Sequence, residues 1–439
     1  MSEKTTKQKK YSSRPRRAVI VGGVRSPFVK AFGPYLTMDT ITLATAVVKA
    51  LLEKYPLPQG SIDSLVWGGV ILPSACPNTA REIVIDANLP RSTEAFTVSR
   101  ACASGLQAIT TAAMAIERGD ADIVIAGGSD STSNAEIQLP QKLVHELAPL
   151  AFGKAKPSDL IGSLARLNFA KDVLPRAPKI AERSTGQTMG EAAEDMARRN
   201  EISREAQDNL AFESHQRAAN AVTTGRFDDE VVPIQCQNGE WVHQDQLIRA
   251  STTREKLSKL RSAFAKNGSL TAGNSSPLTD GASATLLMSE EKAESLGLTP
   301  KAAILDWAYV GVDPADQLLM GPALSIPKVL AKSGLELGDV SLVDIHEAFA
   351  SQVLSVVKML ASDSFAQKRL GRKQAVGQIG PAKLNVHGGS IAIGHPFAAT
   401  GSRMVNTMAN ELALGQGEFA VLGICAAGGL GASALLQRL

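Results

Sequence analysis

The order strand, loop, helix, strand is predicted twice in this chain, and the fold must accommodate both copies. In the first copy, a strand at 96–99 runs into a turn that holds Cys102-Ala-Ser-Gly. A helix with apolar residues at helical spacing follows at 106–118, and a β-branched run at 122–126 predicts the next strand. Gly127 and Gly128 end that strand.

The second copy lies near the C-terminus. A strand at 383–386 leads through a Gly-rich loop with Gly394-His-Pro to a helix at 402–412, and a strand at 419–423 leads to Cys425. Two such copies predict an α/β protein made of two halves with like topology. In both copies the reactive side chains stand on loops at strand ends.

The β-branched run at 18–23 ends in Gly22-Gly and predicts a first buried strand, as in dinucleotide-binding folds. The Gly-x-Gly-x-x-Gly pattern of those folds is absent, and Pro27 stands where a phosphate-binding helix would begin. A nicotinamide-dependent enzyme is therefore disfavoured. An amphipathic helix at 40–54 and a strand at 64–71 follow.

Residues 419–436 carry no charge over eighteen positions, which is long enough for a membrane span. Glycines at 423, 428, 429 and 431 interrupt this stretch. They fit two buried strands joined by a tight turn better than one continuous helix. We therefore predict a strand pair here.

The composition indicates a globular chain with a large core. Of 439 residues 44% are hydrophobic, and 46 basic against 43 acidic residues leave a net charge of +3. This charge is too small to indicate nucleic-acid binding. The four cysteines form no Cys-x-x-Cys pair and have no His at zinc-ligand spacing, so neither a disulfide framework nor a metal site is predicted.

Residues 1–17 are polar and basic and lack the apolar segment of a secretory signal. We predict a disordered basic tail; Glu3 and the Lys-rich start disfavour a transit peptide. Separate cysteines fit a reducing compartment. We therefore expect a cytoplasmic protein whose membrane contact is at most peripheral.

Residues 131–270, between the two copies, are polar and predicted to be mainly helical, as an inserted loop domain. Within them, 141–185 holds eight Lys or Arg against four Asp or Glu. This excess suits a solvated face, a rim for a phosphate-bearing ligand, or a partner or membrane surface. The expected organisation is the tail, an N-terminal half at 18–290 that includes the loop domain, and a C-terminal half at 296–439.

Cys102 is a candidate nucleophile. A thiolate attacks carbonyls well and leaves well, and both properties depend on its pKa. Cys102 follows a predicted strand and precedes a helix, so free N–H groups and the helix dipole should lower the pKa of its thiol. A lone cysteine at such a place is more often structural, and the hypothesis therefore needs partners.

His395 and Cys425 are the candidate partners. His395 is held between Gly394 and a proline, where an imidazole can take the proton of Cys102 and later polarise a thioester oxygen. Cys425 stands in a Gly/Ala-rich turn that lets backbone approach a substrate closely. A second thiol suits proton transfer to and from a carbon beside a thioester.

Five motifs, in order, resemble the thiolase family. They are Ser99-Arg-Ala-Cys-Ala-Ser-Gly, Thr271-Ala-Gly-Asn-Ser-Ser-Pro-Leu-Thr-Asp-Gly-Ala, His346-Glu-Ala-Phe-Ala, Asn385-Val-His-Gly-Gly-Ser-Ile-Ala-Ile-Gly-His-Pro and Cys425-Ala-Ala-Gly-Gly. The resemblance runs from about Arg17 to the C-terminus. It implies duplicated halves in an αβαβα layering.

The resemblance also implies an acetyl-CoA C-acyltransferase of the 3-ketoacyl-CoA thiolase type, with ping-pong kinetics. Cys102 would be acylated, His395 would be its base, and Cys425 would carry the proton of the leaving or attacking group. Coenzyme A would be a substrate, with no permanently bound cofactor and no metal. One oxyanion site would use His395 with a group held by the His346 motif, and the other the N–H groups of Cys102 and Ala427.

Three positions depart from the commonest family pattern. His346 stands where most thiolases carry Asn, and this is similar to the branch with the thiolase (beta) subunit of the fatty-acid oxidation trifunctional complex. Ala-Ala follows Cys425 in place of Gly-Gly. Thr188-Met-Gly stands where many short-chain thiolases have His-Met-Gly, so Thr188 occupies the position of a pantetheine contact.

The same resemblance assigns further residues to substrate and CoA. Ser276 matches a pantetheine-contacting serine, and Phe349 belongs to the His346 motif. Arg249 falls where an arginine meets the nucleotide end. A forked guanidinium suits phosphate, and a solvated surface arginine is the alternative.

The leading hypothesis is a degradative 3-ketoacyl-CoA thiolase for medium to long chains in fatty-acid β-oxidation. A biosynthetic acetoacetyl-CoA thiolase would use the same residues in the condensing direction. A decarboxylating ketosynthase would need a second His where Cys425 stands. A non-catalytic acyl-CoA carrier would not be expected to keep Cys102, His395 and Cys425 together. The expected assembly is a homodimer, in this branch within a complex that holds a hydratase/dehydrogenase subunit.

Overall fold

The computed structural model describes residues 16–154, 167–175 and 181–439, with the single positions 156, 158, 162 and 165. Contacts divide the chain into two compact units. One is Ala135–Ile180, and the other joins Met1–Asn134 to Ala181–Leu439.

Most of the predicted N-terminal tail, at 1–15, lies outside the described residues. Arg16 and Arg17 contradict the prediction that the tail reaches residue 17. Arg16 forms a salt bridge with Asp122, and Arg17 forms one with Glu290. These contacts fix both arginines beside the sheet.

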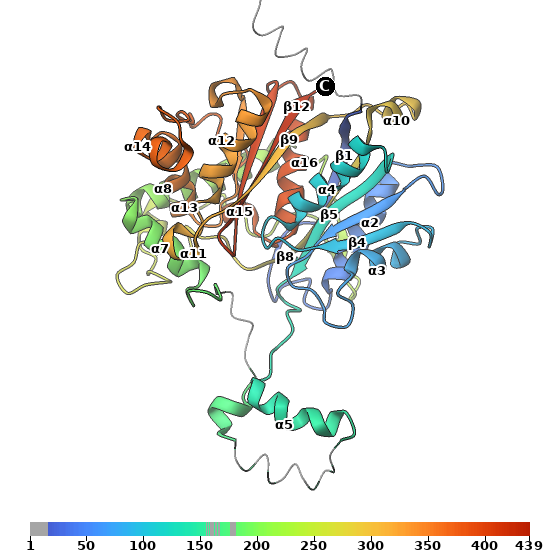
Figure 1. The fold of residues 1–439 in the computed structure, drawn as a ribbon, viewed down its shortest axis with the longest axis vertical. Coiled ribbons are helices and arrows are strands. Elements are labelled where there is room, and N and C mark those ends of the chain that lie inside the picture. Colours follow the sequence, from blue (N-terminus) through green and yellow to red (C-terminus); the bar gives the residue numbers. More distant parts are fainter. Residues whose placement is uncertain are drawn as a thin grey trace, which may run out of the picture. The chain divides into compact units, whose positions relative to one another are not determined.

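A ten-stranded sheet organises the larger unit (Figure 1). Nine strands follow in the order β10-β11-β12-β9-β1-β8-β5-β3-β4, and β2 pairs with β8. A small second sheet pairs β6 with β7. The strands are β1 (Ala18–Arg25), β2 (Val29–Lys30), β3 (Ser64–Gly68), β4 (Glu94–Val98), β5 (Ile123–Ser131), β6 (Ile234–Gln235), β7 (Trp241–Val242), β8 (Thr279–Ser289), β9 (Ala302–Gly311), β10 (Leu342–Ile345), β11 (Phe419–Ala426) and β12 (Leu430–Arg438).

The two ends of this strand order repeat one pattern. β4, β3 and β5 are parallel neighbours, followed by antiparallel β8 and β1. β10 and β11 are likewise parallel, followed by antiparallel β12 and β9. The halves join where β1 pairs with β9 at Val19 and Ile20. The prediction of two halves with like topology is confirmed.

The predicted strand at 383–386 is wrong. In its place Leu384 makes one isolated parallel bridge to Val343, at the position where β4 pairs with β3 in the other half. Asn385 has a φ of 45°, and its side-chain amide binds the N–H and the C=O of Ile345 at 2.8 and 2.9 Å. The side chain thus replaces bonds that a longer strand would make, and the left-handed backbone ends the pairing.

In the described part of the chain, the three largest of five hydrophobic cores lie between the layers. Along β5, Val124 and Ala126 face a central core, whereas Ile123 and Ile125 face an outer core. This alternation is that of a strand buried on both faces. Helices α4 (Ser104–Arg118) and α16 (Ala399–Ala413) contact each other and contribute to the central core between the half-sheets.

Other helices cover the outer faces of the two half-sheets. α2 (Thr40–Lys54) and α3 (Thr79–Asp86) pack on the N-terminal half, and α12 (Gly321–Ser333) and α13 (Ala350–Leu360) pack on the C-terminal half. The resulting order is α, β, α, β, α, as the resemblance implied. The remaining helices of the larger unit are α7 (Met189–Arg199), α8 (Arg204–Thr223), α9 (Arg254–Ser258), α10 (Glu290–Ser295), α11 (Pro314–Gln317), α14 (Asp363–Phe365) and α15 (Ser390–Ile393), with short turns η2 (Leu337–Asp339) and η3 (Ala366–Leu370).

The boundaries of α2 and α4 follow from their sequences. Asp39 caps α2 by accepting a hydrogen bond from the Thr42 N–H at 2.8 Å, and the helix covers the predicted 40–54. α4 begins two residues before the predicted start, at Ser104. It ends at Gly119, whose φ of 81° suits a glycine C-cap.

The charge-free stretch near the C-terminus forms β11 and β12, which confirms the predicted strand pair. Gly428 and Gly429 make the turn with φ values of 84° and 67°, which favour glycine. Across the pair, Cys425 lies opposite Gly431. Among the described residues, no helix is both long and apolar enough to cross a bilayer.

The smaller unit, Ala135–Ile180, holds α5 (Gln141–Ala151) and the π-helical turn η1 (Phe169–Val173). Lys142 of α5 binds Asp172 of the turn at 3.0 Å. Several of the basic residues counted in 141–185, such as Arg166 and Lys179, lie outside the described residues.

Candidate active site

Cys102 lies in a tight turn between β4 and α4. Ala101 has a φ of 45°, which is sparsely populated for a residue with a side chain. Ser104 holds the turn, because its hydroxyl donates to the Ala101 carbonyl at 2.6 Å and accepts from the Arg100 N–H at 2.8 Å. Backbone strain of this kind persists where the surroundings fix it, and it is common at active sites.

The start of α4 lies directly against the loop that carries His395. A Cβ added to Gly105 would lie 2.2 Å from the carbonyl oxygen of Ala398, so only glycine permits this approach. Cys102 and His395 are therefore brought together by backbone packing between the two halves.

His395 is fixed on three sides. Its ring Nδ1 lies 2.6 Å from the Thr400 hydroxyl, and its backbone N–H donates to the Thr279 hydroxyl at 3.0 Å. Phe397, with a φ of 27°, packs its ring edge-on at 5.2 Å. Because Thr400 occupies Nδ1, Nε2 is the nitrogen available for chemistry.

His346 follows β10 and stacks beside His395, with ring centroids 4.2 Å apart. Its Nδ1 lies 3.0 Å from the Ser390 hydroxyl. Its Nε2 is buried and has no hydrogen-bond partner within the described part of the chain. The Cys102 sulfur and a ring nitrogen of each histidine all lie within 4.8 Å of one another.

Cys425 and Ala427 form the other side of the site. Cys425, at the end of β11, is 1% exposed, and Cys102 is near enough to influence the pKa of its thiol. The Ala427 N–H donates to the Cys102 sulfur, and so does the N–H of Cys102 itself. The predicted oxyanion donors, Cys102 and Ala427, therefore point at one sulfur.

Backbone N–H groups lower the pKa of Cys102 as expected, but burial outweighs them, so the expected net lowering is not found. Burial raises the pKa of the Cys102 thiol to about 12, and the charge of Asp130 raises it further, against the lowering effect of the two backbone N–H groups. Burial also raises the pKa of Cys425 well above its usual value, with an added contribution from Cys102. Both thiols rest protonated.

Both histidines rest neutral. Burial lowers the pKa of His395 to about 3 and that of His346 well below its usual value. The positive charge of Arg403 adds to both shifts. Arg403 is 1% exposed and lies 3.4 Å from Asp344, which is its ion-pair partner below the site.

Asp130, at the end of β5, connects three segments around the site. Its carboxylate accepts from the N–H groups of Val70 and Ile71 at 3.0 and 2.6 Å, and from that of Ala398 at 2.8 Å. Burial raises its pKa to about 7 despite these bonds. The carboxylate thus holds the backbone just after His395.

Glu182 holds the turn that follows Cys425. Its Oε2 accepts from the Gly428 N–H at 2.9 Å, and its Oε1 accepts from the Ser184 hydroxyl at 3.1 Å. The next residue toward Cys425 is Ala427, whose N–H reaches the Cys102 sulfur. Glu182 therefore holds the turn next to the N–H group that the resemblance assigns to an oxyanion site.

Ser276 lies beside the His346 motif, which includes Phe349. The Ser276 N–H donates to the Ala348 carbonyl at 3.0 Å, and Ser275 forms a bridge with Phe349. Phe349 is buried, and its ring packs edge-on against Phe264 at 5.7 Å. The segment of Ser276 continues to Leu278, which pairs with His395.

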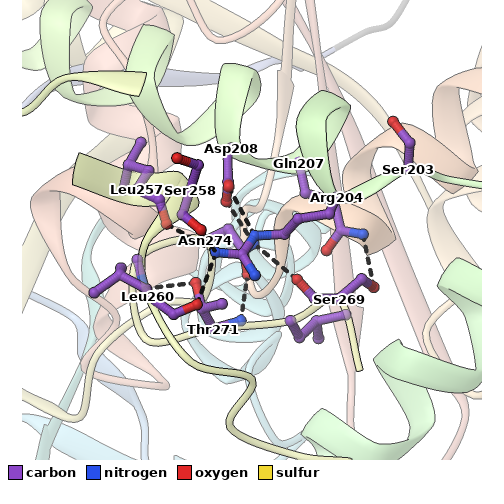
Figure 2. Close-up of polar contacts among 12 residues, drawn as sticks. Ser203, Arg204, Gln207, Asp208, Leu257, Ser258, Leu260, Ser269, Thr271 and Asn274 are labelled. Atoms are coloured by element: carbon purple, nitrogen blue, oxygen red, sulfur yellow. Dashed lines mark hydrogen bonds and ion pairs between the residues drawn. The ribbon is translucent and has the colours of Figure 1, made fainter. Parts of the chain in front are cut away.

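A polar cluster anchors this segment to α8. Figure 2 shows the Arg204 guanidinium between the Asp208 carboxylate and the carbonyls of Leu257 and Leu260, at 2.7, 2.8 and 3.0 Å. The second Asp208 oxygen accepts from the Asn274 side chain at 2.9 Å. The cluster thus fixes the backbone two residues before Ser276.

The structure gives Thr188 and Arg249 partners other than Cys102 and the two histidines. Thr188 is the N-cap of α7 and shares a capping box with Glu191, so its hydroxyl already serves the helix. Arg249 is exposed, and its N–H donates to His215 Nδ1 at 3.2 Å. Burial lowers the pKa of His215 to about 4, which keeps that acceptor neutral.

Sequence reasoning missed Asp130, Glu182, Arg403, Ser390 and Thr400. Asp130 directly follows the Gly-Gly-Ser that ends a predicted strand, and Thr400 lies five residues after His395 at the start of a helix. These two positions carried a usable signal, because polar residues at strand ends and helix starts often serve sites. Glu182 and Arg403 carried none.

Two family models match the chain: "Thiolase, N-terminal domain" over residues 18–291 and "Thiolase, C-terminal domain" over 298–438. The 3-ketoacyl-CoA thiolases of Yersinia pestis (strain Pestoides F) and Yersinia pseudotuberculosis serotype O:3 (strain YPIII) are each 44% identical to it over 424 residues. These residues are 96% of this chain and 97% of each relative.

Two solved structures are similar along nearly their whole length. Bacillus anthracis acetyl-CoA acetyltransferase has a TM-score of 0.84 at 32% identity, over 97% of this chain and 99% of that one. Human mitochondrial 3-ketoacyl-CoA thiolase in complex with CoA has a TM-score of 0.82 at 30% identity, over 97% of this chain and 98% of that one.

Proposed function

The chain belongs to the thiolase family, and from this premise we propose how its residues cleave 3-ketoacyl-CoA with CoA. The products are acetyl-CoA and a shortened acyl-CoA, as in fatty-acid β-oxidation. One observation carries the proposal. The Cys102 sulfur lies within 4.8 Å of ring nitrogens of two neutral histidines, with the Cys425 thiol nearby.

In the first half-reaction, His395 Nε2 takes the Cys102 proton as the sulfur attacks the 3-keto carbon. The oxyanion that forms there is stabilised by the N–H groups of Cys102 and Ala427. The bond between C2 and C3 then breaks. The enolate oxygen of the departing acetyl-CoA accepts from the protonated His395, beside His346, and C2 takes the Cys425 proton.

In the second half-reaction, the Cys425 thiolate takes the proton of incoming CoA. The CoA sulfur attacks the acyl group on Cys102. The N–H groups of Cys102 and Ala427 stabilise the oxyanion that forms. Cys102 leaves as a thiolate and regains its proton from His395. Protons and sulfur atoms balance, and each thiol returns to its starting state.

CoA is the only cosubstrate that this scheme requires. We propose Ser276 and Phe349 at the pantetheine and acyl end, because Phe349 belongs to the His346 motif and the segment of Ser276 pairs with that motif. Exposed Arg249 is proposed for the phosphates of the nucleotide. Thr188 is proposed near the pantetheine only because of its position in the sequence motif, since its hydroxyl caps α7.

Chain length is the first point to test. Purified protein is expected to cleave 3-ketohexadecanoyl-CoA with a higher kcat/KM than acetoacetyl-CoA, and Cys102→Ser is expected to abolish both activities. Good cleavage of acetoacetyl-CoA without cleavage of the long substrate would instead favour the biosynthetic type.

We also propose a homodimer formed through β4. Among the described residues this strand ends the sheet order and pairs only with β3, and Phe96 and Val98 are only partly buried. An unpaired edge strand of this kind readily adds a second strand. A monomeric mass in sedimentation velocity would contradict this assembly, and co-purification from native extract would test for a hydratase/dehydrogenase partner.

The proposed location is the cytoplasm. All four cysteines, Cys76, Cys102, Cys236 and Cys425, are free thiols, which suits a reducing compartment.

A further inference from the structure

Cys102, His346 and His395 together have the donor set of a zinc site. Their ligand atoms lie within 4.8 Å of one another, and no other three His, Cys, Asp or Glu side chains do so in the described ranges. Sulfur and imidazole nitrogen are the ligands that Zn²⁺ prefers. The three residues lie on separate segments, which is why their spacing in the sequence carries no metal signature.

The orientation of the two rings supports the same conclusion. His346 is fully buried, and its Nε2 has no hydrogen-bond partner among the described residues. The Nδ1 atoms face hydroxyls instead, of Ser390 at 3.0 Å and of Thr400 at 2.6 Å. A metal-bound imidazole characteristically forms a hydrogen bond through the ring nitrogen that does not bind the metal. Here that nitrogen is Nδ1, and its hydrogen bond fixes the tautomer that offers Nε2.

The fit requires only a small contraction. Bonds of about 2.3 Å to sulfur and about 2.0–2.1 Å to nitrogen place tetrahedral ligand atoms roughly 3.3–3.7 Å apart. The three ligand atoms now lie within 4.8 Å of one another, so they must move closer by on the order of 1 Å. Changes of side-chain torsion supply this movement. A fourth position stays open to water.

We propose that Cys102, His346 and His395 form an inhibitory binding site for Zn²⁺. Binding converts the Cys102 thiol to a zinc-bound thiolate and releases one proton, with no change of oxidation state. The bound metal removes the sulfur from acyl transfer and occupies the nitrogen of His395. Inhibition rests on the proposed function, whereas the binding itself does not.

His346 is the residue that completes the site. With His346→Asn, one sulfur and one nitrogen remain, and two protein ligands hold zinc much more weakly than three. Ser390→Ala removes the hydroxyl behind His346. Loss of an outer partner of this kind typically weakens metal binding by about 10–100-fold.

The binding test uses the full chain and ZnCl₂, titrated against a chromophoric chelator. We expect one tight equivalent per chain, abolished in His346→Asn and weakened about 10–100-fold in Ser390→Ala. Cys76→Ser removes a free thiol outside the site and is expected to bind like the parent. Thermal melting of each variant shows that it is folded.

Two further measurements on the unaltered chain do not depend on variants. X-ray absorption is expected to show one sulfur and two imidazole nitrogens around zinc. Zn²⁺ should also block acetylation of Cys102 by acetyl-CoA, and a chelator should restore it, while MgCl₂, which prefers oxygen ligands, should have no effect. This half-reaction is used because free CoA and other thiols compete for zinc.

Oxygen-only coordination, or tight binding that survives in His346→Asn, would overturn the zinc site. Zinc bound with one sulfur and two nitrogens, but without any effect on acetylation, would overturn the inhibition. In contrast, failure of acetylation in metal-free protein would count against the proposed function and leave the binding result standing.

Discussion

Burial leaves Cys102 and His395 both uncharged before substrate arrives. The pKa of the thiol is raised to about 12 and that of the imidazole is lowered to about 3. The raised pKa favours the thiol over the thiolate at neutral pH, and in the proposed mechanism the proton therefore moves to His395 as the sulfur attacks. His395 can accept it because burial and Arg403 keep the ring neutral.

These shifts predict an unusual pH dependence. A base whose pKa is lowered stays competent at every pH above that value, so the rate of Cys102 acetylation should show no loss around pH 6.5, where an ordinary histidine titrates. The measurement is the acetylation rate by acetyl-CoA between about pH 5 and pH 8.

Asp130 titrates in the same pH range, because its pKa is about 7. The acetylation rate of Asp130→Asn is therefore measured over the same range as a control. An inflection that disappears in Asp130→Asn belongs to Asp130. One near pH 6.5 that persists in both proteins would contradict a neutral, buried His395.

At the scale of elements, three strained turns carry the site between regular segments. Ala101, Asn385 and Phe397 have φ values of 45°, 45° and 27°. Ala101 and Asn385 lie in motifs that the sequence singled out, and Phe397 directly follows one. Each is held by side-chain bonds or close packing. Two carboxylates, Asp130 and Glu182, accept hydrogen bonds from the backbone of loops at the site, at Ala398 and Gly428.

Asp130→Asn should break one contact selectively. If the amide oxygen keeps the bonds to Val70 and Ile71, the amide NH₂ must face the Ala398 N–H. We expect a stability loss of about 1–3 kcal/mol. Displacement of the His395 loop should cost roughly tenfold to a hundredfold in acetylation rate. Thermal unfolding and acetylation measure the two, and a fully active variant would refute the positioning role.

Glu182→Ala should release the Gly428 N–H and loosen the turn that holds Ala427 and Gly428. Loss of a hydrogen bond worth about 1 kcal/mol predicts a fall in kcat of roughly fivefold with little change in KM. Glu182→Gln keeps an acceptor and should restore most of the rate in steady-state thiolysis. Equal loss in both variants would argue against this role.

The elements themselves were largely predictable. β-Branched runs and apolar spacing located β1, α2, β5, α16 and the final strand pair, because their burial imposes a regular period. The strand predicted at 383–386 failed, since the Asn385 side chain replaces backbone pairing there. A hydrophobic pattern does not predict that a side chain will take the place of backbone hydrogen bonds.

At the scale of the whole molecule, the site exists only because the halves meet. α4 and α16 pack in one central layer, which brings Cys102 of one half to His395 of the other. The motifs revealed those residues, but not the buried Arg403 or the contact of Glu182 with Gly428. Contacts across such sequence distances depend on the finished fold, and no local pattern predicts them.

Cys102 is expected to carry the acyl group between the two half-reactions. The most direct measurement is rapid-quench peptide mass spectrometry after the chain is mixed with 3-ketohexadecanoyl-CoA in the absence of CoA. We expect a tetradecanoyl thioester on the peptide that contains Cys102, and its disappearance when CoA is added. An unmodified Cys102 peptide, or acyl transfer to Cys425 instead, would contradict the account.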